Sequence, residues 1–200
     1  MSGAEAVKAE VDEIDVLRGA EYALLSVLLG QAPGTDLLSR VAGLRGDATP
    51  LGMAHVELAD AARATDEKAA GREYFNLFIG VGRGELLPYG SYYQTGFLHE
   101  RPLARVREDL ATLGIERAGQ MREPEDHIAI LCEIMAGMAR GDFLADTKKQ
   151  GEFFERHLQP WAARFFADLE TTGEAQFYKS VGRVGRTFME LETEAFKLPH

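Results

Sequence analysis

Apolar residues recur every three to four positions along nearly the whole of this 200-residue chain, and this spacing limits the fold more than any other feature. Near the N-terminus the series runs through Ile14, Leu17, Leu24, Leu25 and Leu28, and near the C-terminus through Phe177, Val181, Val184, Phe188 and Leu191. Such spacing marks one face of an α-helix. No alternating apolar and polar run of the kind that favours a β-strand exceeds a few residues. The sequence therefore predicts an all-α protein.

Breaks in this pattern divide the chain into further helices. Pro50 suits a helix start and Gly114 a helix end, while "GVGRGELLPYGS" (Gly80–Ser91) is the one clearly irregular stretch. The expected helices after the first cover residues 36–44, 51–64, 66–78, 102–113, 146–158, 160–171 and 174–196, with one more beginning at Pro124. There is no internal repeat and no long linker, and chains of roughly 100–200 residues bury one core. We expect residues 1–200 to form a single-domain bundle of helices.

Composition narrows the class of protein. A formal net charge of −10 argues against binding to nucleic acid, which requires clustered Lys and Arg, and is compatible with a basic peptide as partner. Cys132 is the only cysteine, so neither an intramolecular disulfide nor a cysteine-based zinc site is expected, which fits a reducing compartment. The first thirty residues have charges within the apolar series and resemble neither a signal peptide nor a membrane span. These features predict a cytoplasmic location without membrane insertion.

The stretch "EPEDH" places acidic and titratable groups directly before the long apolar run. Pro124 suits the first position of a helix, and acids in the first turn oppose the positive end of the helix dipole. On such a helix Glu123, Asp126 and His127 fall at i, i+3 and i+4 and share one face, while Glu125 turns away. The pattern leaves four interpretations open: a helix cap with a hydrogen-bonded histidine, an acid–base site, a metal site, or a surface that grips a basic peptide.

Residues elsewhere in the sequence argue against a catalytic or metal site at this cluster. The other histidines show no paired ligand spacing, and Cys132 occupies an apolar position within a helix, where it indicates core packing. "GVGRG" follows no strand and precedes no Gly-Lys-Ser/Thr, so it indicates a plain loop rather than a phosphate site. A metal- or carboxylate/histidine-dependent hydrolase using Glu123, Asp126 and His127 remains the alternative to a binding protein.

Two aromatic clusters complete the pattern. "EYFNLFIG" and "EFFERHLQPWAARFFADLE" carry aromatic residues at helical spacing, which is typical of a core; the second includes Phe154, Leu158, Trp161 and Phe165. The tyrosines at positions 89, 92 and 93 differ, because they lie in or beside a polar, glycine-rich loop. Amphipathic aromatic residues in such a place favour contact with an extended partner.

Four motifs in fixed order resemble the TorD/DmsD/NarJ family. They are "EYFNLFIGVGRGELLPYGSYY", a leucine-bearing helix ending in "LGIE", "EPEDHIAILCEIMAGM" and "FFERHLQPWAARFFADLE", and together they cover about Glu73 to Glu170. The members of this family are cytoplasmic chaperones for molybdenum- or tungsten-containing redox enzymes. The loop departs from the common family pattern at Leu87 and Tyr89, where members often carry proline and tryptophan.

The resemblance implies an all-helical TorD-like fold, no enzymatic activity and no required cofactor, with weak guanine nucleotide binding in some members. It implies that the protein binds the twin-arginine signal peptide and the apo form of a molybdoenzyme catalytic subunit, delays export until maturation and assists cofactor insertion. A monomer or a domain-swapped dimer is expected. The partner-binding residues that it implies are Leu77, Phe78, Pro88, Tyr89, Ser91, Tyr92, Glu123, Pro124, Asp126 and His127.

These residue types suit such a peptide. Carboxylates offer charge-assisted hydrogen bonds to its guanidinium groups, and an apolar groove buries the segment that follows them. An imidazole between two acids is expected to tune the grip, because the charge of histidine ordinarily changes near neutrality.

Overall fold

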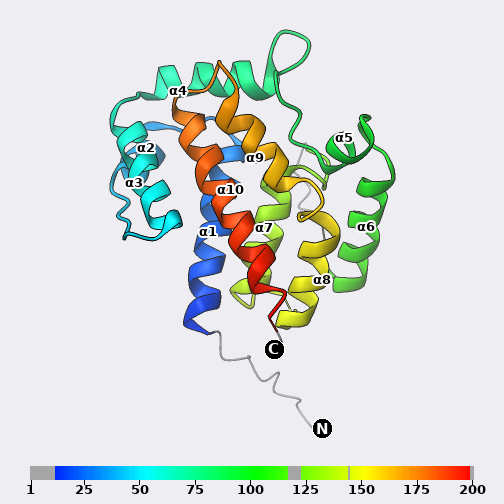
Figure 1. Cartoon of the computed structure of the whole chain (residues 1–200). Helices are drawn as coiled ribbons and strands as arrows, with labels where there is room; N and C mark the ends of the chain where they lie inside the picture. The colour runs from blue at the N-terminus through cyan, green and yellow to red at the C-terminus, as the bar shows by residue number, and fades with distance from the viewer. Residues whose placement is uncertain (1–11, 117–122, 144, 199–200) are drawn as a thin grey trace, which may run out of the picture.

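The computed structural model describes residues 12–116, 123–143 and 145–198, and within these ranges the chain is helical without a β-strand (Figure 1). The α-helices are α1 (Glu13–Gly30), α2 (Thr35–Ala42), α3 (Pro50–Arg63), α4 (Glu67–Tyr74), α5 (Gly90–Thr95), α6 (Arg101–Leu113), α7 (Ile128–Ala139), α8 (Thr147–His157), α9 (Ala162–Thr171) and α10 (Phe177–Ala195). A π-helical turn, η1 (Phe75–Ile79), continues α4. The all-α prediction is confirmed.

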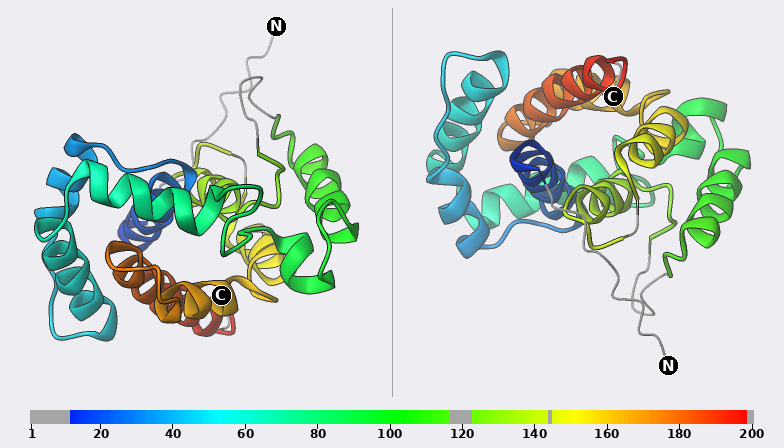
Figure 2. Two further views of the ribbon diagram at one scale, coloured as in Figure 1. Left: turned by 90° about the horizontal axis from the view of Figure 1, so that it is seen from above. Right: turned by 90° about the horizontal axis from the view of Figure 1, so that it is seen from below.

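The centre of the molecule is built on two pairs of helices, α1 with α7 and α9 with α10. Every residue of α7 except Glu133 is buried, as expected for a helix that is apolar on nearly all sides. Helix α3 packs against α10 and α2 against α3. Figure 2 shows α2 and α3 on one side of the central helices and α5 and α6 on the opposite side.

Several helix ends lie where the sequence places them. Pro50 opens α3, the Asp66 side chain caps α4, and Gly114 ends α6 in the left-handed conformation with φ 67°. Helix α9 begins at Ala162 rather than at residue 160, because the Trp161 N–H bonds to the Leu158 carbonyl in a turn that separates it from α8.

Helix α10 also begins later than expected, at Phe177 instead of residue 174, and a distant side chain caps it. The segment between α9 and α10 supplies no side-chain cap of its own. Instead, the Glu73 carboxylate of α4 accepts hydrogen bonds from the backbone N–H groups of Gln176 at 2.8 Å, Phe177 at 3.1 Å and Tyr178 at 2.6 Å. A carboxylate at this end also opposes the helix dipole. Glu73 thus joins the helix that leads into the glycine-rich loop to the last helix of the core.

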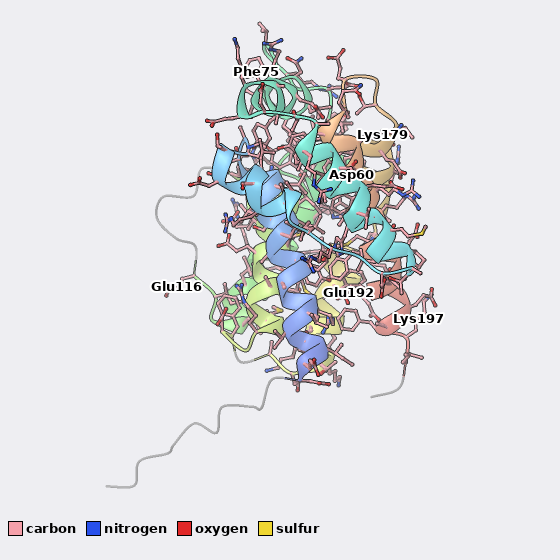
Figure 3. All side chains as sticks on the ribbon, turned by 90° about the vertical axis from the view of Figure 1, so that its left-hand side faces the viewer. Asp60, Phe75, Glu116, Lys179, Glu192 and Lys197 are labelled. Atoms are coloured by element: carbon pink, nitrogen blue, oxygen red, sulfur yellow. The ribbon has the colours of Figure 1, made fainter. Side chains whose placement is uncertain are left out.

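A partly buried ion pair ties α1 to the C-terminal half of α10. The Arg18 guanidinium donates from Nε and Nη2 to the two carboxylate oxygens of Glu192, each at 2.8 Å, and the Tyr22 hydroxyl donates to Glu192 Oε2 at 2.8 Å. Such a bidentate pair fixes orientation as well as charge. Figure 3 shows the molecule from the side of α2 and α3, with Phe75 labelled at the top and Glu192 in the lower half.

The second aromatic cluster is core, as predicted: Phe154, Leu158, Trp161 and Phe165 are all buried. The first aromatic cluster lies only partly in the core, because Leu77 is fully buried while Phe75 of η1 is 42 % exposed. None of the described helices is both long and apolar enough to cross a membrane.

Candidate functional site

The glycine-rich loop and the "EPEDH" motif are bound to each other. Tyr89 and His127 form an isolated antiparallel β-bridge. On either side of it, the Ile128 N–H donates to the Pro88 carbonyl and the Gly90 N–H donates to the Asp126 carbonyl, both at 2.9 Å. We call this contact between Pro88–Ser91 and Glu123–Ile128 the loop junction. It joins two segments that the chain separates by the remainder of α5 and by α6.

The predicted helix start at Pro124 is wrong, because α7 begins at Ile128 with His127 as its N-cap. The His127 N–H donates to the Pro124 carbonyl at 3.0 Å, which closes a turn, and the His127 backbone is extended. Glu125 and Asp126 therefore precede the helix and do not occupy its first turn. The first N–H of the helix is directed to Pro88, so a contact from a distant segment decides where the helix begins.

Glu123, Asp126 and His127 consequently do not share a helix face at i, i+3 and i+4 as the sequence suggested. Each of the three side chains instead has a different hydrogen-bond partner. Glu123 is half-buried, whereas Asp126 and His127 are buried. The cluster exists, but its geometry comes from the turn and the loop.

Asp126 holds the start of α5. Its side chain is 1 % exposed, and Oδ2 accepts a hydrogen bond from the Ser91 backbone N–H at 2.7 Å. Asp126 Oδ1 and the Ser91 hydroxyl, both buried, have no hydrogen-bond partner in the described part of the chain. A buried N–H left without an acceptor destabilises a fold, so this carboxylate has a structural role before any role in binding.

Tyr89 and Glu123 form the outer side of the junction. The Tyr89 hydroxyl donates to Glu123 Oε2 at 2.6 Å, and the Tyr89 ring meets the His127 ring edge-on with centroids 5.1 Å apart. Burial, followed by the hydrogen bond to Glu123, raises the pKa of Tyr89 well above its usual range, so the phenol keeps its proton and remains a donor.

His127 is a neutral residue at physiological pH. Burial lowers its pKa to about 4, although Glu123 and Asp126 act in the opposite direction. The unprotonated Nδ1 accepts the Ala129 backbone N–H at 3.1 Å, which is the capping bond of α7. The expectation that the charge of His127 changes near neutrality and tunes a grip is therefore wrong, because desolvation outweighs the two neighbouring acids.

The other predicted partner-binding residues lie at different depths. Leu77 is fully buried, and Phe78 is half-buried and meets Tyr74 and Tyr178 edge-on. They anchor the loop, because the Leu86 N–H bonds back to the Leu77 carbonyl at 2.8 Å. The remaining four are Pro88 and Ser91, which are buried in the junction, and Pro124 and Tyr92, which are half-buried.

The arrangement gives little support to the hydrolase alternative. Asp126 is engaged with backbone at α5 and His127 with backbone at α7, so neither is positioned to activate a nucleophile. Cys132 is fully buried in α7, and burial raises the pKa of its thiol. Among the residues that the structure describes, no group of three or more His, Cys, Asp or Glu side chains is arranged to hold a metal ion.

Two features of this region join residues from different parts of the chain. The Arg107 guanidinium of α6 donates to Glu125 at 2.9 Å, and a cavity of about 410 Å³ separates the loop from Arg164 and Asp168 of α9. The sequence gives no local signal for either, since both join residues that are far apart in the chain.

The fold and the junction define an all-helical protein whose glycine-rich loop is fastened to an acidic, histidine-containing turn. Residues 44–167, more than half of the chain, match the family described as nitrate reductase delta subunit, and the chain belongs to this family. The resemblance to the TorD/DmsD/NarJ family is thereby confirmed.

Individual relatives agree with the family. The chain is 28 % identical over 131 residues to the chaperone protein TorD of Vibrio parahaemolyticus, a match that covers 60 % of this chain and 61 % of the relative. It is 28 % identical over 160 residues to the chaperone protein TorD of Aliivibrio fischeri, covering 69 % and 74 %. The match thus spans only about three fifths of the V. parahaemolyticus protein.

Among solved structures, the crystal structure of a protein described as a redox enzyme maturation protein from Archaeoglobus fulgidus has the same fold. Its TM-score is 0.58 at 24 % sequence identity, and the match covers 87 % of this chain and 94 % of that one. The relatives are named chaperones, in agreement with the expectation of a protein without enzymatic activity of its own.

Proposed function

We propose that this protein binds the twin-arginine signal peptide and the apo form of a molybdenum- or tungsten-containing oxidoreductase in the cytoplasm. In this role it delays export until the enzyme is mature and assists insertion of the cofactor. Membership in a family whose relatives are named TorD chaperones supports this proposal. The single observation that carries it in this chain is the loop junction, which holds Tyr89 and the carboxylates of Glu123 and Asp126 together beside an apolar core.

The residues of the loop junction differ in burial, and we propose different roles for the buried and the half-buried ones. Asp126, His127, Pro88 and Ser91 are buried and fix the shape of the loop. Glu123 and Tyr89 are half-buried and lie on its outer side, where they meet a ligand first. We assign the direct guanidinium contact to Glu123, because a carboxylate at a partly buried site forms a charge-assisted hydrogen bond to arginine.

Two further expectations belong to the same proposal. Weak guanine nucleotide binding follows from the family resemblance, and a monomer or a domain-swapped dimer follows from the glycine-rich hinge within a helical domain; both await a direct measurement. Size-exclusion chromatography with light scattering gives the oligomeric state, and calorimetry with GTP tests the nucleotide.

A substitution at Glu123 tests the proposed contact. The ligand is the signal peptide of a molybdoenzyme encoded beside this gene, titrated by calorimetry into wild-type protein and into Glu123→Gln. A hydrogen bond to a charged group contributes about 1.5–3 kcal/mol, so we expect the Kd to rise roughly tenfold or more. Glu155→Gln is the matched control, because Glu155 is an exposed acid of α8 away from the junction. Equal affinity in both variants would remove Glu123 from the site.

A further inference from the structure

The apolar stripes of α1 and α10 continue past the covered part of the bundle. Ile14 and Leu17 belong by spacing to the stripe of α1 that is buried at Leu25, yet they are 64 % and 66 % exposed. Leu191 follows Phe188 in the stripe of α10, and it is 48 % exposed whereas Phe188 is buried. Single exposed apolar residues are ordinary, but three of them at the ends of two core-facing stripes define a surface.

The pairing of α1 with α10 brings these exposed ends together. The two helices are antiparallel, because Arg18 bonds to Glu192 near one end of the pair, and the Tyr178 hydroxyl donates to the Leu28 carbonyl at 2.9 Å near the other. The exposed residues therefore lie at the same end of the pair, beside the Arg18–Glu192 contact. We call the surface made by Ile14, Leu17 and Leu191 the α1–α10 face.

Helix α3 covers the same side of the two helices further along. It packs against α10, and His55 Nε2 lies 2.9 Å from Glu21 Oε2 of α1, one helical turn from Leu17. Helix α3 begins at Pro50, and Figure 1 shows α1 and α10 extending beyond it. The α1–α10 face is therefore the uncovered continuation of a surface on which this protein already packs a helix.

The α1–α10 face lies in an acidic end of the molecule. Residues 12–18 and 186–198 hold six acids and three bases. Each base forms an ion pair within the protein: Arg18 with Asp15 and Glu192, Arg186 with Glu170 and Glu190, and Lys197 with Glu194. Glu13 is exposed and forms no ion pair in the described part of the chain. A partner with basic residues beside apolar ones complements this face.

The charge of this end argues against two other occupants. A second copy of the chain would bring two acidic ends together, and like charges oppose such a contact. The chain's own first eleven residues hold two acids and one lysine, so they do not supply the missing positive charge. The complementary partner is therefore another protein.

We propose that the α1–α10 face holds a basic amphipathic helix of the apo-enzyme, outside its signal peptide. The inference rests on the proposed function and adds to it a second contact with the same client. A helix fits because its apolar stripe takes the place beside α1 and α10 that α3 takes further along, while its Lys and Arg side chains meet acids such as Glu13. Figure 1 shows this end at the bottom of the molecule and α5, which begins at the loop junction, at the upper right, so the two sites engage different parts of the client.

Substitution of the two leucines tests the face. The probe is the catalytic subunit of a molybdoenzyme encoded beside this gene, prepared as the apo form without its signal peptide and titrated by calorimetry. We expect Leu17→Ser with Leu191→Ser to raise its Kd roughly tenfold or more, because two leucine side chains lose their burial against the partner. Val27→Ser is the matched control, since Val27 is an exposed apolar residue of α1 on the side of α7, and the affinity should not change. Both variants should keep the wild-type Kd for the signal peptide.

Glu13→Lys tests the charge of the face separately. We expect it to weaken binding of the same subunit by roughly two- to fivefold at low ionic strength, and by less in high salt, because exposed charges are screened. Glu155→Lys, an equal charge change in α8, should leave the affinity unchanged.

Subunit binding that neither the leucine nor the Glu13 substitutions change overturns the α1–α10 face and leaves the proposed function intact. The face is also overturned if the signal peptide binds and the subunit without it does not. Two results assign the face to another occupant and overturn the proposal: a wild-type dimer, seen by light scattering, that the leucine substitutions dissociate, and tighter subunit binding after deletion of residues 1–11. Absence of binding to both the peptide and the subunit overturns the proposed function as well.

Discussion

The Asp126 carboxylate accepts the backbone N–H of Ser91 at 2.7 Å, across 35 positions of the sequence. This bond fastens the start of α5 to the turn that precedes α7, and it lies entirely inside the protein. Asp126, which the family resemblance implies as a partner-binding residue, therefore accepts a hydrogen bond within the fold itself. The bond has a consequence for stability that is separate from any effect on peptide binding.

Replacement of Asp126 by alanine is expected to destabilise the protein even without a ligand. The substitution leaves the buried Ser91 N–H without its acceptor, which costs about 1–3 kcal/mol. Urea unfolding followed by circular dichroism measures the change, with Asp60→Ala as the control, because an exposed ion pair contributes at most about 1 kcal/mol. Equal free energies of unfolding for the two variants would argue against the structural role of Asp126.

Glu73→Ala is expected to loosen the start of α10. Three backbone N–H groups lose one shared carboxylate, and bonds to a charged acceptor are worth about 1.5–3 kcal/mol. Hydrogen exchange measures the effect locally: the amides of Gln176, Phe177 and Tyr178 should exchange faster than in wild type. Unchanged protection of these amides would show that water or another side chain replaces the cap.

The lowered pKa of His127 predicts a loss of stability in mild acid. Its ordinary pKa is 6.5 and its value in the folded protein is about 4, so the unfolded chain binds more protons between these values. The free energy of unfolding therefore falls as pH drops from 6.5 toward 4, by up to about 3 kcal/mol from this residue.

His127→Asn isolates this contribution, because asparagine caps a helix and does not titrate. Denaturant unfolding at a series of pH values should give a shallower slope for this variant below pH 6.5. Parallel curves for wild type and His127→Asn would mean that the imidazole is accessible to protons in the folded state.

His55 should give stability the opposite pH dependence to that of His127, because its pKa is raised in the folded protein. Its Nε2 lies 2.9 Å from Glu21 Oε2, and this hydrogen bond raises the pKa of His55 against the effect of burial. The pair therefore stabilises the contact between α1 and α3 fully below the ordinary pKa of 6.5, and this contribution is lost as pH rises through the higher folded value. His55→Gln should flatten the pH dependence on the alkaline side of 6.5, in the same unfolding series.

The helices were predictable from sequence because their signals are local. The spacing of Phe177, Val181 and Val184 defines a face within one segment, and Gly114 ends a helix through its own backbone freedom. The start of α7 was not predictable in this way. The Ile128 N–H pairs with Pro88, which the chain reaches only through α5 and α6, so a distant contact overrides the proline and acids that favour an earlier start.

In the candidate site, too, the features that depend on neighbouring residues were predictable from sequence and those that depend on distant contacts were not. The motif located Glu123, Asp126 and His127 correctly as a cluster, because their proximity follows from adjacency in the chain. Their burial and hydrogen-bond partners depend on the loop packed against them. The Tyr93–Asp168 contact spans 75 positions and joins two separate motifs, so only the packing of α5 against α9 reveals it.

The proposed function requires this protein to recognise guanidinium groups in a signal peptide. Calorimetric titration of wild-type protein with two peptides that differ only in an Arg-Arg or a Lys-Lys pair before the same apolar segment measures that recognition. Both carry equal charge, so only the stacking and forked hydrogen bonding of arginine distinguish them. We expect saturable binding of the Arg-Arg peptide and binding of the Lys-Lys peptide that is weaker by roughly tenfold or more. Equal affinity for the two peptides, or no binding of either, would contradict it.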